Sequence, residues 1–323
     1  MSGTEGAAAR ATATVPVPVP AHGRAAGVTV RVPAKVNVQL AVGGARPDGF
    51  HDLANVFLAV SLFDEVTATP AAELKITCEG PDADQVPLDR TNLAARAAEL
   101  LAARHGLSPD VHLHIKKDIP VAGGMAGGSA DGAGALLACD RLWGLDSPRA
   151  DLLDICAELG SDVPFSLVGG AALGVGRGER LTELPVSGTF HWVFAVADGG
   201  LSTPAVYGAF DRLNDGVDVP EPVASPALLE ALRTGDTAAL AATLMNDLQP
   251  AAVFLRPSLT DVLEAGTKAG ALAALVSGSG PTTAFLVQDA ASADAVAAAL
   301  IASGTCRTAR AATSPAPGAA VLA

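Results

Sequence analysis

A glycine-rich stretch at residues 120–130 offers the clearest chemistry in this sequence. It follows a predicted strand at 111–115 and leads into a predicted helix at 129–143. Glycine lets a backbone approach a ligand closely and adopt positive φ, and the free N–H groups of a first helical turn favour an anion. Ser129 either caps this helix or binds a phosphate. We therefore interpret the stretch as a phosphate-binding loop, with a glycine turn that binds no ligand as the alternative.

The two best-known phosphate-binding motifs do not fit this stretch. A P-loop requires Lys-Ser or Lys-Thr directly after its glycines, whereas Gly128 is followed by Ser129 and Ala130. The dinucleotide motif requires GxGxxG after the first strand of a βαβ unit, whereas these glycines come as doublets far into the chain. A phosphate site here therefore belongs to another kind of fold.

Polar residues that could do chemistry also stand near the start of the chain. Lys35 and Asn37 lie between predicted strands at 28–32 and 38–42. Because they are two residues apart on extended chain, their side chains share one face. The alternative is that Lys35 is an ordinary solvated charge.

A carboxylate and a small-residue turn complete the candidate constellation. Asp162 follows the end of a predicted helix and precedes a predicted strand at 167–175. An aspartate that only shapes a turn is the alternative reading of this position. Residues 277–283 form a turn of small residues between two predicted strands.

Strands and helices are mixed along the chain without a regular alternation, which favours an α+β fold over a doubly wound sheet. After position 198 the pattern predicts helices at 204–213, 226–245 and 257–269, then two strands within 272–287 and a helix at 291–301. A stretch with glycine and proline at 178–189 is the candidate domain boundary.

Together these segments resemble the GHMP kinase superfamily. The glycine-rich loop resembles its second motif and residues 277–283 its third. Residues 46–53, Arg-Pro-Asp-Gly-Phe-His-Asp-Leu, and 246–250, Asn-Asp-Leu-Gln-Pro, are similar to segments of the member family that phosphorylates a cytidine diphosphate sugar alcohol. The resemblance covers residues 28–305, with Phe50 where tyrosine is usual and alanine at position 126 where glycine is usual.

This resemblance implies a two-domain GHMP kinase fold. An N-terminal ribosomal protein S5 domain 2-like domain over residues 28–185 would bind ATP, and a ferredoxin-like domain would cover 186–310. We expect disordered segments at 1–27, where Val-Pro repeats break any helix, and at 311–323.

The resemblance also implies the catalytic and nucleotide-binding residues. Asp162 would accept the proton of the substrate hydroxyl, and Lys35 beside it would stabilise charge on the attacking oxygen and the γ-phosphate. Mg²⁺ would bridge phosphate oxygens, with Ser129 as a candidate ligand. The ATP phosphates would lie against a loop formed by Pro120, Val121, Ala122, Gly123, Gly124, Met125, Ala126, Gly127, Gly128, Ser129 and Ala130.

The small-molecule substrate implied by the resemblance, a cytidine diphosphate sugar alcohol, would occupy the other half of the site. Asn37 would bind the polyol. Phe50 would stack on the cytosine, a contact worth roughly 1–3 kcal/mol. His51 would hydrogen-bond the base edge, and Tyr207, the only tyrosine in the chain, would stack on the other face.

Composition excludes several classes of protein. A formal charge of −13 argues against a nucleic-acid-binding protein. No apolar run approaches the length of a membrane span, and four scattered cysteines without a CxxC pair suit a reduced cytoplasmic enzyme. We expect a monomer or homodimer.

Two other functions compete with this interpretation. One is another kinase of the superfamily, of the homoserine or mevalonate type, which would have no cytosine for residues 48–51 to hold. The other is a kinase-shaped regulatory protein without catalysis, which the presence of both Lys35 and Asp162 argues against.

Overall fold

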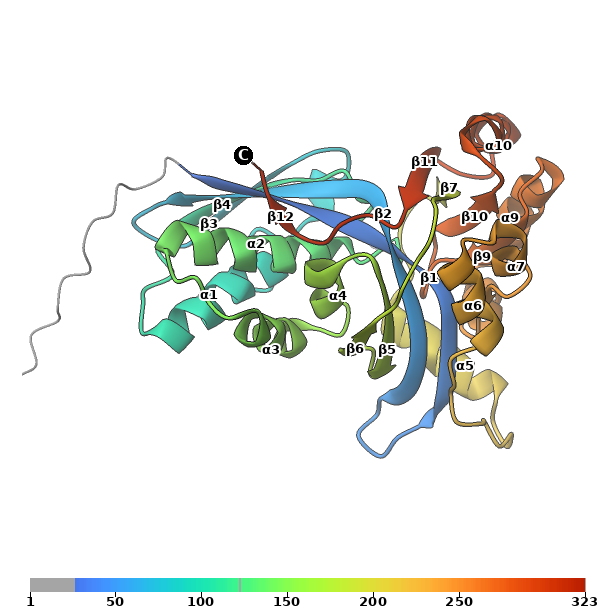
Figure 1. Ribbon diagram of the computed structural model, residues 1–323, viewed down its shortest axis with the longest axis horizontal. Coiled ribbons are helices and arrows are strands. Elements are labelled where there is room, and N and C mark those ends of the chain that lie inside the picture. The colour runs from blue at the N-terminus through green and yellow to red at the C-terminus, as the bar shows by residue number, and fades with distance from the viewer. Residues whose placement is uncertain (1–26, 122, 323) are drawn as a thin grey trace, which may run out of the picture.

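The computed structural model describes residues 27–121 and 123–322, which form two β-sheets with helices packed on them (Figure 1). The predicted α+β class is confirmed. The expected disordered extension at 1–27 lies outside these residues except for Gly27. Within the same ranges, no helix is long and apolar enough to cross a membrane.

The first sheet is built on a hairpin of two very long strands. β1 and β2 contain 18 and 20 residues, against about five or six in an ordinary strand. The strand order is β12-β1-β2-β4-β3, with β5 and then β6 beside the rest of β2 and β8 beside β1. The strands are β1 (Val28–Ala45), β2 (His51–Pro70), β3 (Lys75–Glu79), β4 (Val111–Lys116), β5 (Ala171–Gly176), β6 (Arg180–Glu183), β8 (Met245–Asn246) and β12 (Ala320–Val321).

The extended structure predicted at 28–32 and 38–42 is confirmed, and both ranges belong to the single strand β1, which also includes the residues between them. Its pairing with β2 shifts register between Pro33 and Ala34. A bulge of this kind lets a proline, which has no N–H to donate, stand inside a continuous strand. The polar residues that follow Pro33 are therefore held on a paired strand rather than on a connection.

Four helices cover one face of the first sheet (Figure 1). The buried apolar side chains of the first two helices, over 93–105 and 127–143, are mostly alanines, and those of the facing strands are mostly valines and leucines. Small side chains let the helices approach the sheet closely, which is how a chain with 4% aromatic residues fills its core. The helices are α1 (Leu93–His105), α2 (Gly127–Trp143), α3 (Arg149–Leu159) and α4 (Val163–Val168).

Helix α4 corrects the strand predicted at 167–175. Residues 163–168 are helical, with Pro164 in the first turn, and β5 begins only at Ala171. Gly169 and Gly170 separate the two elements, both with positive φ. The prediction failed because a short buried apolar run has the same appearance in a helix and in a strand.

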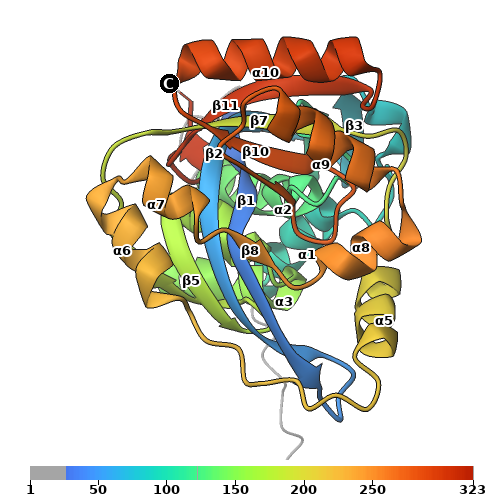
Figure 2. The same ribbon diagram turned by 90° about the vertical axis from the view of Figure 1, so that its right-hand side faces the viewer.

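The second sheet has the strand order β11-β7-β10-β9, and all its neighbours are antiparallel. Numbered one to four along the chain, these strands lie in the order 4-1-3-2. This is the strand order of a ferredoxin-like sheet, so the predicted ferredoxin-like domain is confirmed. Helices α9 and α10 pack on one face of it, as Figure 2 shows. The elements are β7 (Phe190–Val196), α9 (Leu259–Lys268), β9 (Ala273–Val276), β10 (Thr283–Val287), α10 (Ala290–Ser303) and β11 (Thr308–Ser314).

Between β7 and α9 the chain forms a set of short elements. The single helix predicted at 226–245 is in fact two helices, because Gly235, at φ 73°, closes the first and the Asp236 side chain caps the second. The elements are α5 (Thr203–Leu213), α6 (Pro226–Thr234), α7 (Thr237–Ala241) and α8 (Gln249–Leu255). A single turn of 3₁₀ helix occupies Ala83–Gln85.

The prediction of a disordered tail at 311–323 is wrong for the described part, which reaches residue 322. Strand β11 pairs with β7 as far as Ser314. The chain then returns to the first sheet, where β12 pairs with β1. Ala312 and Ala316 are buried on the way. This stretch is rich in alanine, proline and glycine and has no periodicity, which is also the pattern of a disordered tail. The same small residues let the chain pack closely against both sheets as it passes from one to the other.

A buried cluster of three charged side chains anchors the flanks of the glycine-rich loop. Lys117, just past β4, donates from Nζ to Oδ2 of Asp64 on β2 and, over 2.9 Å, to Oδ2 of Asp131 on α2. All three side chains are almost fully buried. Oδ1 of Asp64 also accepts the backbone N–H groups of Asp118 and Ile119, at 2.7 and 2.8 Å. One lysine thus joins the chain before the loop to the helix after it.

The cluster holds two carboxylates for one ammonium group. Burial raises the pKa of Asp131 above its usual range, and the charge of Lys117 offsets this only in part. Burial opposes the charge of Lys117 too, but the two carboxylates outweigh it and raise the pKa of the lysine. Oδ1 of Asp131 has no hydrogen-bond partner among the described residues. Asp131 therefore binds a proton more tightly in the folded protein than in the unfolded chain.

This difference predicts how Asp131 affects stability. Because the folded state binds the proton more tightly, stability is lost as the pH rises through the raised pKa of Asp131. Asp131→Asn cannot titrate, so its free energy of unfolding relative to wild type should increase by about 1 kcal/mol or more between about pH 5 and about pH 8. Urea denaturation at both pH values measures this change.

Lys117→Met is the control of opposite sign. It leaves the buried Asp64 carboxylate without its cation and Asp131 without its hydrogen-bond donor, so it should destabilise the fold by roughly 3–5 kcal/mol near neutral pH. An Asp131→Asn variant that loses stability relative to wild type as the pH rises would contradict the assignment.

Candidate active site

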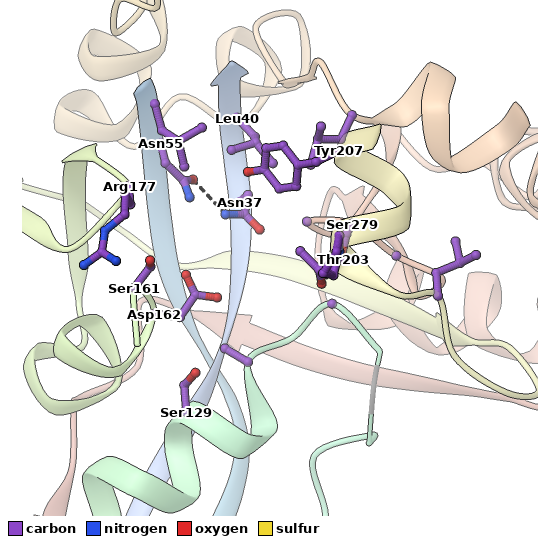
Figure 3. Close-up of a pocket in the computed structure, with 18 of the residues that line it drawn as sticks. Asn37, Leu40, Asn55, Ser129, Ser161, Asp162, Arg177, Thr203, Tyr207 and Ser279 are labelled. Atoms are coloured by element: carbon purple, nitrogen blue, oxygen red, sulfur yellow. Dashed lines mark hydrogen bonds between the residues drawn. The ribbon is translucent and has the colours of Figure 1, made fainter. Parts of the chain in front are cut away.

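A cavity of about 750 Å³ lies between the two halves of the fold. Figure 3 shows β1 and β2 along its back, with the start of α2, the residues before α4, and α5 around it. Segments that are far apart in the sequence line it, including parts of both predicted kinase motifs at 120–130 and 277–283.

The glycine-rich loop forms one wall of this cavity. Its lining residues are Gly123, Gly124 and 126–129. α2 begins at Gly127, two residues earlier than predicted, so the N–H groups of its first turn lie at the wall. Gly124 has φ 76°, and a side chain there would collide with the backbone of the 277–283 turn.

Some predicted loop residues do not reach the cavity. Met125 and Ala130 are fully buried beneath it, and Pro120 lines a separate cavity of about 310 Å³ behind the loop. Val121 is half-buried and lines neither cavity. Ala122 lies outside the described residues.

Ala126 occupies a strained position. Its φ is 61°, in the left-handed region, where alanine costs roughly 1–2 kcal/mol more than it does in the right-handed region. Glycine would adopt this conformation without that cost. The departure from the usual glycine therefore places strain in the loop.

The small-residue turn at 277–283 packs directly on the glycine-rich loop. The Ser277 hydroxyl donates to the Gly124 carbonyl over 3.1 Å, and the Thr282 N–H donates to the Gly123 carbonyl over 3.3 Å. Thr282 and Ser277 are fully buried. The 277–283 turn of the second domain thus binds carbonyl groups of the glycine-rich loop. The N–H groups of the glycine-rich loop are left for a ligand.

Lys35 is buried at the back of the cavity and held by three partners. Its Nζ donates to Asn37 Oδ1 over 2.6 Å and to the Gly124 carbonyl over 2.9 Å, and it lies 3.8 Å from Asp162 Oδ2. Asn37 in turn donates to Asn55 Oδ1 over 2.7 Å, the contact drawn in Figure 3. The structure brings the two predicted catalytic residues together and confirms that Lys35 and Asn37 share a face.

The Lys35–Asp162 pair is asymmetric in exposure. The lysine side chain is 5% exposed and the aspartate side chain 32%. Burial lowers the pKa of Lys35, while the charge of Asp162 acts in the opposite direction. The carboxylate therefore faces the cavity, where a hydroxyl could reach it, and the ammonium of Lys35 lies behind it.

Asp162 is positioned by the start of α4, where it occupies the N-cap position. Its side chain accepts no capping hydrogen bond from the helix, so its carboxylate oxygens are not used by the backbone of α4. Helix α4, which the sequence analysis predicted as part of a strand, is thus the element that positions Asp162, the predicted proton acceptor. Ser161 beside it also lines the cavity (Figure 3).

The predicted cytosine-binding residues gather at the far end of the cavity. His51 is buried and its ring centroid lies 5.0 Å from that of Tyr207. Burial, and then the charge of Asp162, raises the pKa of Tyr207, so its phenol remains protonated. Phe50 is 48% exposed at the mouth. A flat ligand there would meet aromatic groups from both domains.

Two charged residues that sequence reasoning missed join this group. Asp211 Oδ1 lies 2.8 Å from His51 Nε2, so the ring nitrogen left for a ligand is Nδ1. The guanidinium of Arg177, in the β5–β6 hairpin, lies 5.1 Å from the centroid of Phe50. Asp211 stands four residues after Tyr207 on α5, a spacing that places both on one helix face and was available from the sequence.

Positive charge is scarce in the cavity. Among its described lining residues, only Lys35 and Arg177 are lysine or arginine. The described part of the chain also holds no group of three or more histidine, cysteine, aspartate or glutamate side chains placed to bind a metal ion. Backbone N–H groups therefore supply much of the site's capacity for anions.

Comparison with known proteins shows the family of the chain. Residues 92–170 match the family described as GHMP kinases N terminal domain, and 228–305 match GHMP kinases C terminal. The chain is 83% identical over 295 residues to the 4-diphosphocytidyl-2-C-methyl-D-erythritol kinase of Streptomyces avermitilis, which covers 91% of this chain and 99% of that protein. It is 55% identical to the enzyme of that name from Mycobacterium tuberculosis, over 91% of this chain and 93% of the relative.

Solved structures extend the comparison. A crystal structure of a 4-(cytidine 5'-diphospho)-2C-methyl-D-erythritol kinase is 33% identical, with a TM-score of 0.72 over 88% of this chain and 98% of that one. A homoserine kinase from Cytophaga hutchinsonii reaches the same TM-score at 19% identity, over 94% and 100%, and shares the fold. The predicted resemblance is confirmed: this chain belongs to the GHMP kinase family and, within it, to the 4-diphosphocytidyl-2-C-methyl-D-erythritol kinases.

Proposed function

We propose that this protein transfers the γ-phosphoryl group of ATP to the 2-hydroxyl of 4-diphosphocytidyl-2-C-methyl-D-erythritol, in the cytoplasmic non-mevalonate route to isoprenoid precursors. The observation that carries the proposal is the Lys35–Asp162 pair, placed between the glycine-rich loop and the aromatic end of one cavity. The four cysteines are free thiols, as suits a reducing compartment.

The glycine-rich loop and the first turn of α2 would hold the ATP phosphates. The N–H groups there and the helix dipole favour anions. Mg²⁺, when bound, would neutralise charge on the phosphates, and Ser129 at the cavity wall offers it a hydroxyl oxygen. A site with few protein ligands suits Mg²⁺, which usually keeps several waters and binds largely through substrate phosphates.

Asp162 would accept the proton of the attacking hydroxyl as the new O–P bond forms. Lys35 would stabilise negative charge on that oxygen and on the γ-phosphate, since its three partners hold it in place in the cavity lining. Asn37 retains one Nδ2 hydrogen after bonding Asn55, and this group would bind the polyol.

The far end of the cavity would select the substrate. Phe50 and Tyr207 would provide faces for the cytosine, and His51, oriented by Asp211, would offer Nδ1. Arg177 would pair with the diphosphate, because its ion pair with Glu179 is loose, at 3.9 Å. A guanidinium suits phosphate oxygens by its planar set of donors.

The direct test of this function is ADP release on a panel of alcohols. With ATP and Mg²⁺, the cytidine diphosphate sugar alcohol should be turned over far faster than homoserine or mevalonate, because only it engages the Phe50–His51 end. Comparable turnover of homoserine or mevalonate would refute the substrate while leaving the family intact.

Asp162→Asn tests the chemical step. It removes a group that acts mainly in the transition state, so kcat should fall roughly 10²–10⁴-fold with little change in KM for the cytidine substrate. Phe50→Ala is the comparison variant, and it should raise that KM more than it lowers kcat. Steady-state kinetics with a thermal melt of each variant measures both effects. Near-normal kcat in Asp162→Asn would show that another group takes the proton.

Arg177→Gln tests recognition of the diphosphate. A charge-assisted hydrogen bond is worth roughly 1.5–3 kcal/mol, so KM for the cytidine substrate should rise about ten- to hundredfold while KM for ATP stays nearly constant. The wild-type KM should also rise with salt more steeply than that of the variant.

Arg180→Gln is the matched control for this variant. It removes the same charge from the same hairpin, but Arg180 is exposed and does not line the cavity. Equal effects of the two substitutions would indicate a general electrostatic influence and not a contact.

A further inference from the structure

The last described residues form a segment with no counterpart among the predicted elements. Figure 1 shows residues 315–322, in red, leaving β11 and passing α4 to reach β12 at the edge of the first sheet. The segment thus connects the end of the second domain to the helix that carries Asp162.

Backbone hydrogen bonds fix the course of this segment. Ala316 donates to the Ala59 carbonyl over 2.9 Å and accepts from the Gly170 N–H over 2.8 Å. Ala319 donates to the Ser166 carbonyl over 3.1 Å. The segment therefore satisfies a carbonyl in the last turn of α4, where helical carbonyls have no partner within the helix.

Two glycines allow the backbones to touch. A Cβ added to Gly318 would lie 2.5 Å from the Val168 carbonyl oxygen at the end of α4. A Cβ added to Gly169 would overlap the backbone of Gly318. Because the neighbouring atoms are backbone and not flexible side chains, no rotation can relieve either overlap. This contact requires glycine on both sides.

The contact is transmitted to Asp162 through one short helix. α4 has six residues, too few to be stable without tertiary support. The Ser166 N–H and hydroxyl both donate to the Asp162 carbonyl, at 3.2 and 3.3 Å, while the Ser166 carbonyl is the acceptor for Ala319. Phe165 stacks on Phe57 with centroids 4.8 Å apart.

Ala316 completes the same small core. It is buried in one cluster with Phe57 and Phe165. The segment therefore supports α4 by two independent means, a hydrogen bond at its last turn and apolar packing beside its first.

We propose that residues 315–322 are a positioning element of the active site, which holds α4 so that the Asp162 carboxylate stays beside Lys35. The proposal rests on the proposed function in so far as Asp162 is the proton acceptor. Displacement of a reacting group by about 1 Å can cost about 10²-fold in rate, so loss of this support should appear in kcat before it appears in nucleotide binding.

The test uses the full-length chain with Gly318→Ala and a second variant that ends at Ser314. Both should lower kcat about tenfold or more while changing KM for ATP less than about twofold, because the phosphate loop is anchored separately by Lys117. Amide hydrogen exchange should accelerate over 163–170 and remain unchanged in α1. Gly44→Ala is the matched control, since a Cβ there meets nothing within 4 Å.

A double variant tells positioning from general destabilisation. In the Asp162→Asn background, Gly318→Ala should lower kcat little further, because the group it positions is already gone. Faster exchange in α4 with unchanged kcat would overturn the proposal, and so would a rise in KM for ATP as large as the fall in kcat.

The exchange experiment also separates this proposal from the proposed function. If the wild-type protein does not turn over the cytidine substrate, the function fails. The segment's role in holding α4 is then decided by exchange alone, and unchanged protection of 163–170 in both variants would overturn it.

Discussion

The buried ammonium of Lys117 is the interaction on which the nucleotide half of the structure depends. A loop that keeps its N–H groups available to the cavity cannot be stabilised through those groups, so its flanks must be fixed instead. Lys117 does this by joining β2 and α2 through Asp64 and Asp131. The arrangement costs stability, since buried charges are expensive to desolvate, but it fixes both ends of the loop to the sheet.

The long β1–β2 hairpin imposes a second constraint, on the distance between binding and chemistry. β1 carries Lys35 in its middle, and the hairpin turn presents Phe50 and His51 at its end. An extended chain spans about 3.3 Å per residue, so one strand sets the distance between Lys35 and the Phe50–His51 end of the cavity, and with it the distance between the proposed sites of phosphoryl transfer and of base binding. Under the proposed function, binding at the aromatic end would position the substrate for transfer, because remote binding energy can do this without contact at the reacting atoms.

Sequence reasoning identified the parts of this site that depend on local chemistry. The glycine-rich loop and the shared face of Lys35 and Asn37 follow from residue types at fixed spacing, and the family follows from the resemblance of several short motifs. It failed where tertiary context decides: α4 has an apolar run that also suits a strand, and the 315–322 crossing is built from small residues that also suit a tail. The His51–Asp211 pair joins residues 160 apart, and no local pattern shows such a partner.

An acidic protein that binds two polyanions must obtain its positive potential from few sources. With Lys35 and Arg177 as the only lysine or arginine among the described lining residues, the backbone at the start of α2 has to contribute much of it. Backbone N–H dipoles attract an anion strongly only when several of them point at it. Their effect therefore depends more on the geometry of the loop than the effect of a lysine side chain would. This dependence explains why the loop is held from three directions, by Lys117 below, by the 277–283 turn beside it and by Lys35 on the Gly124 carbonyl. The same contacts can hold Ala126 in its strained left-handed conformation, because strain of this kind persists where the surrounding structure fixes the backbone.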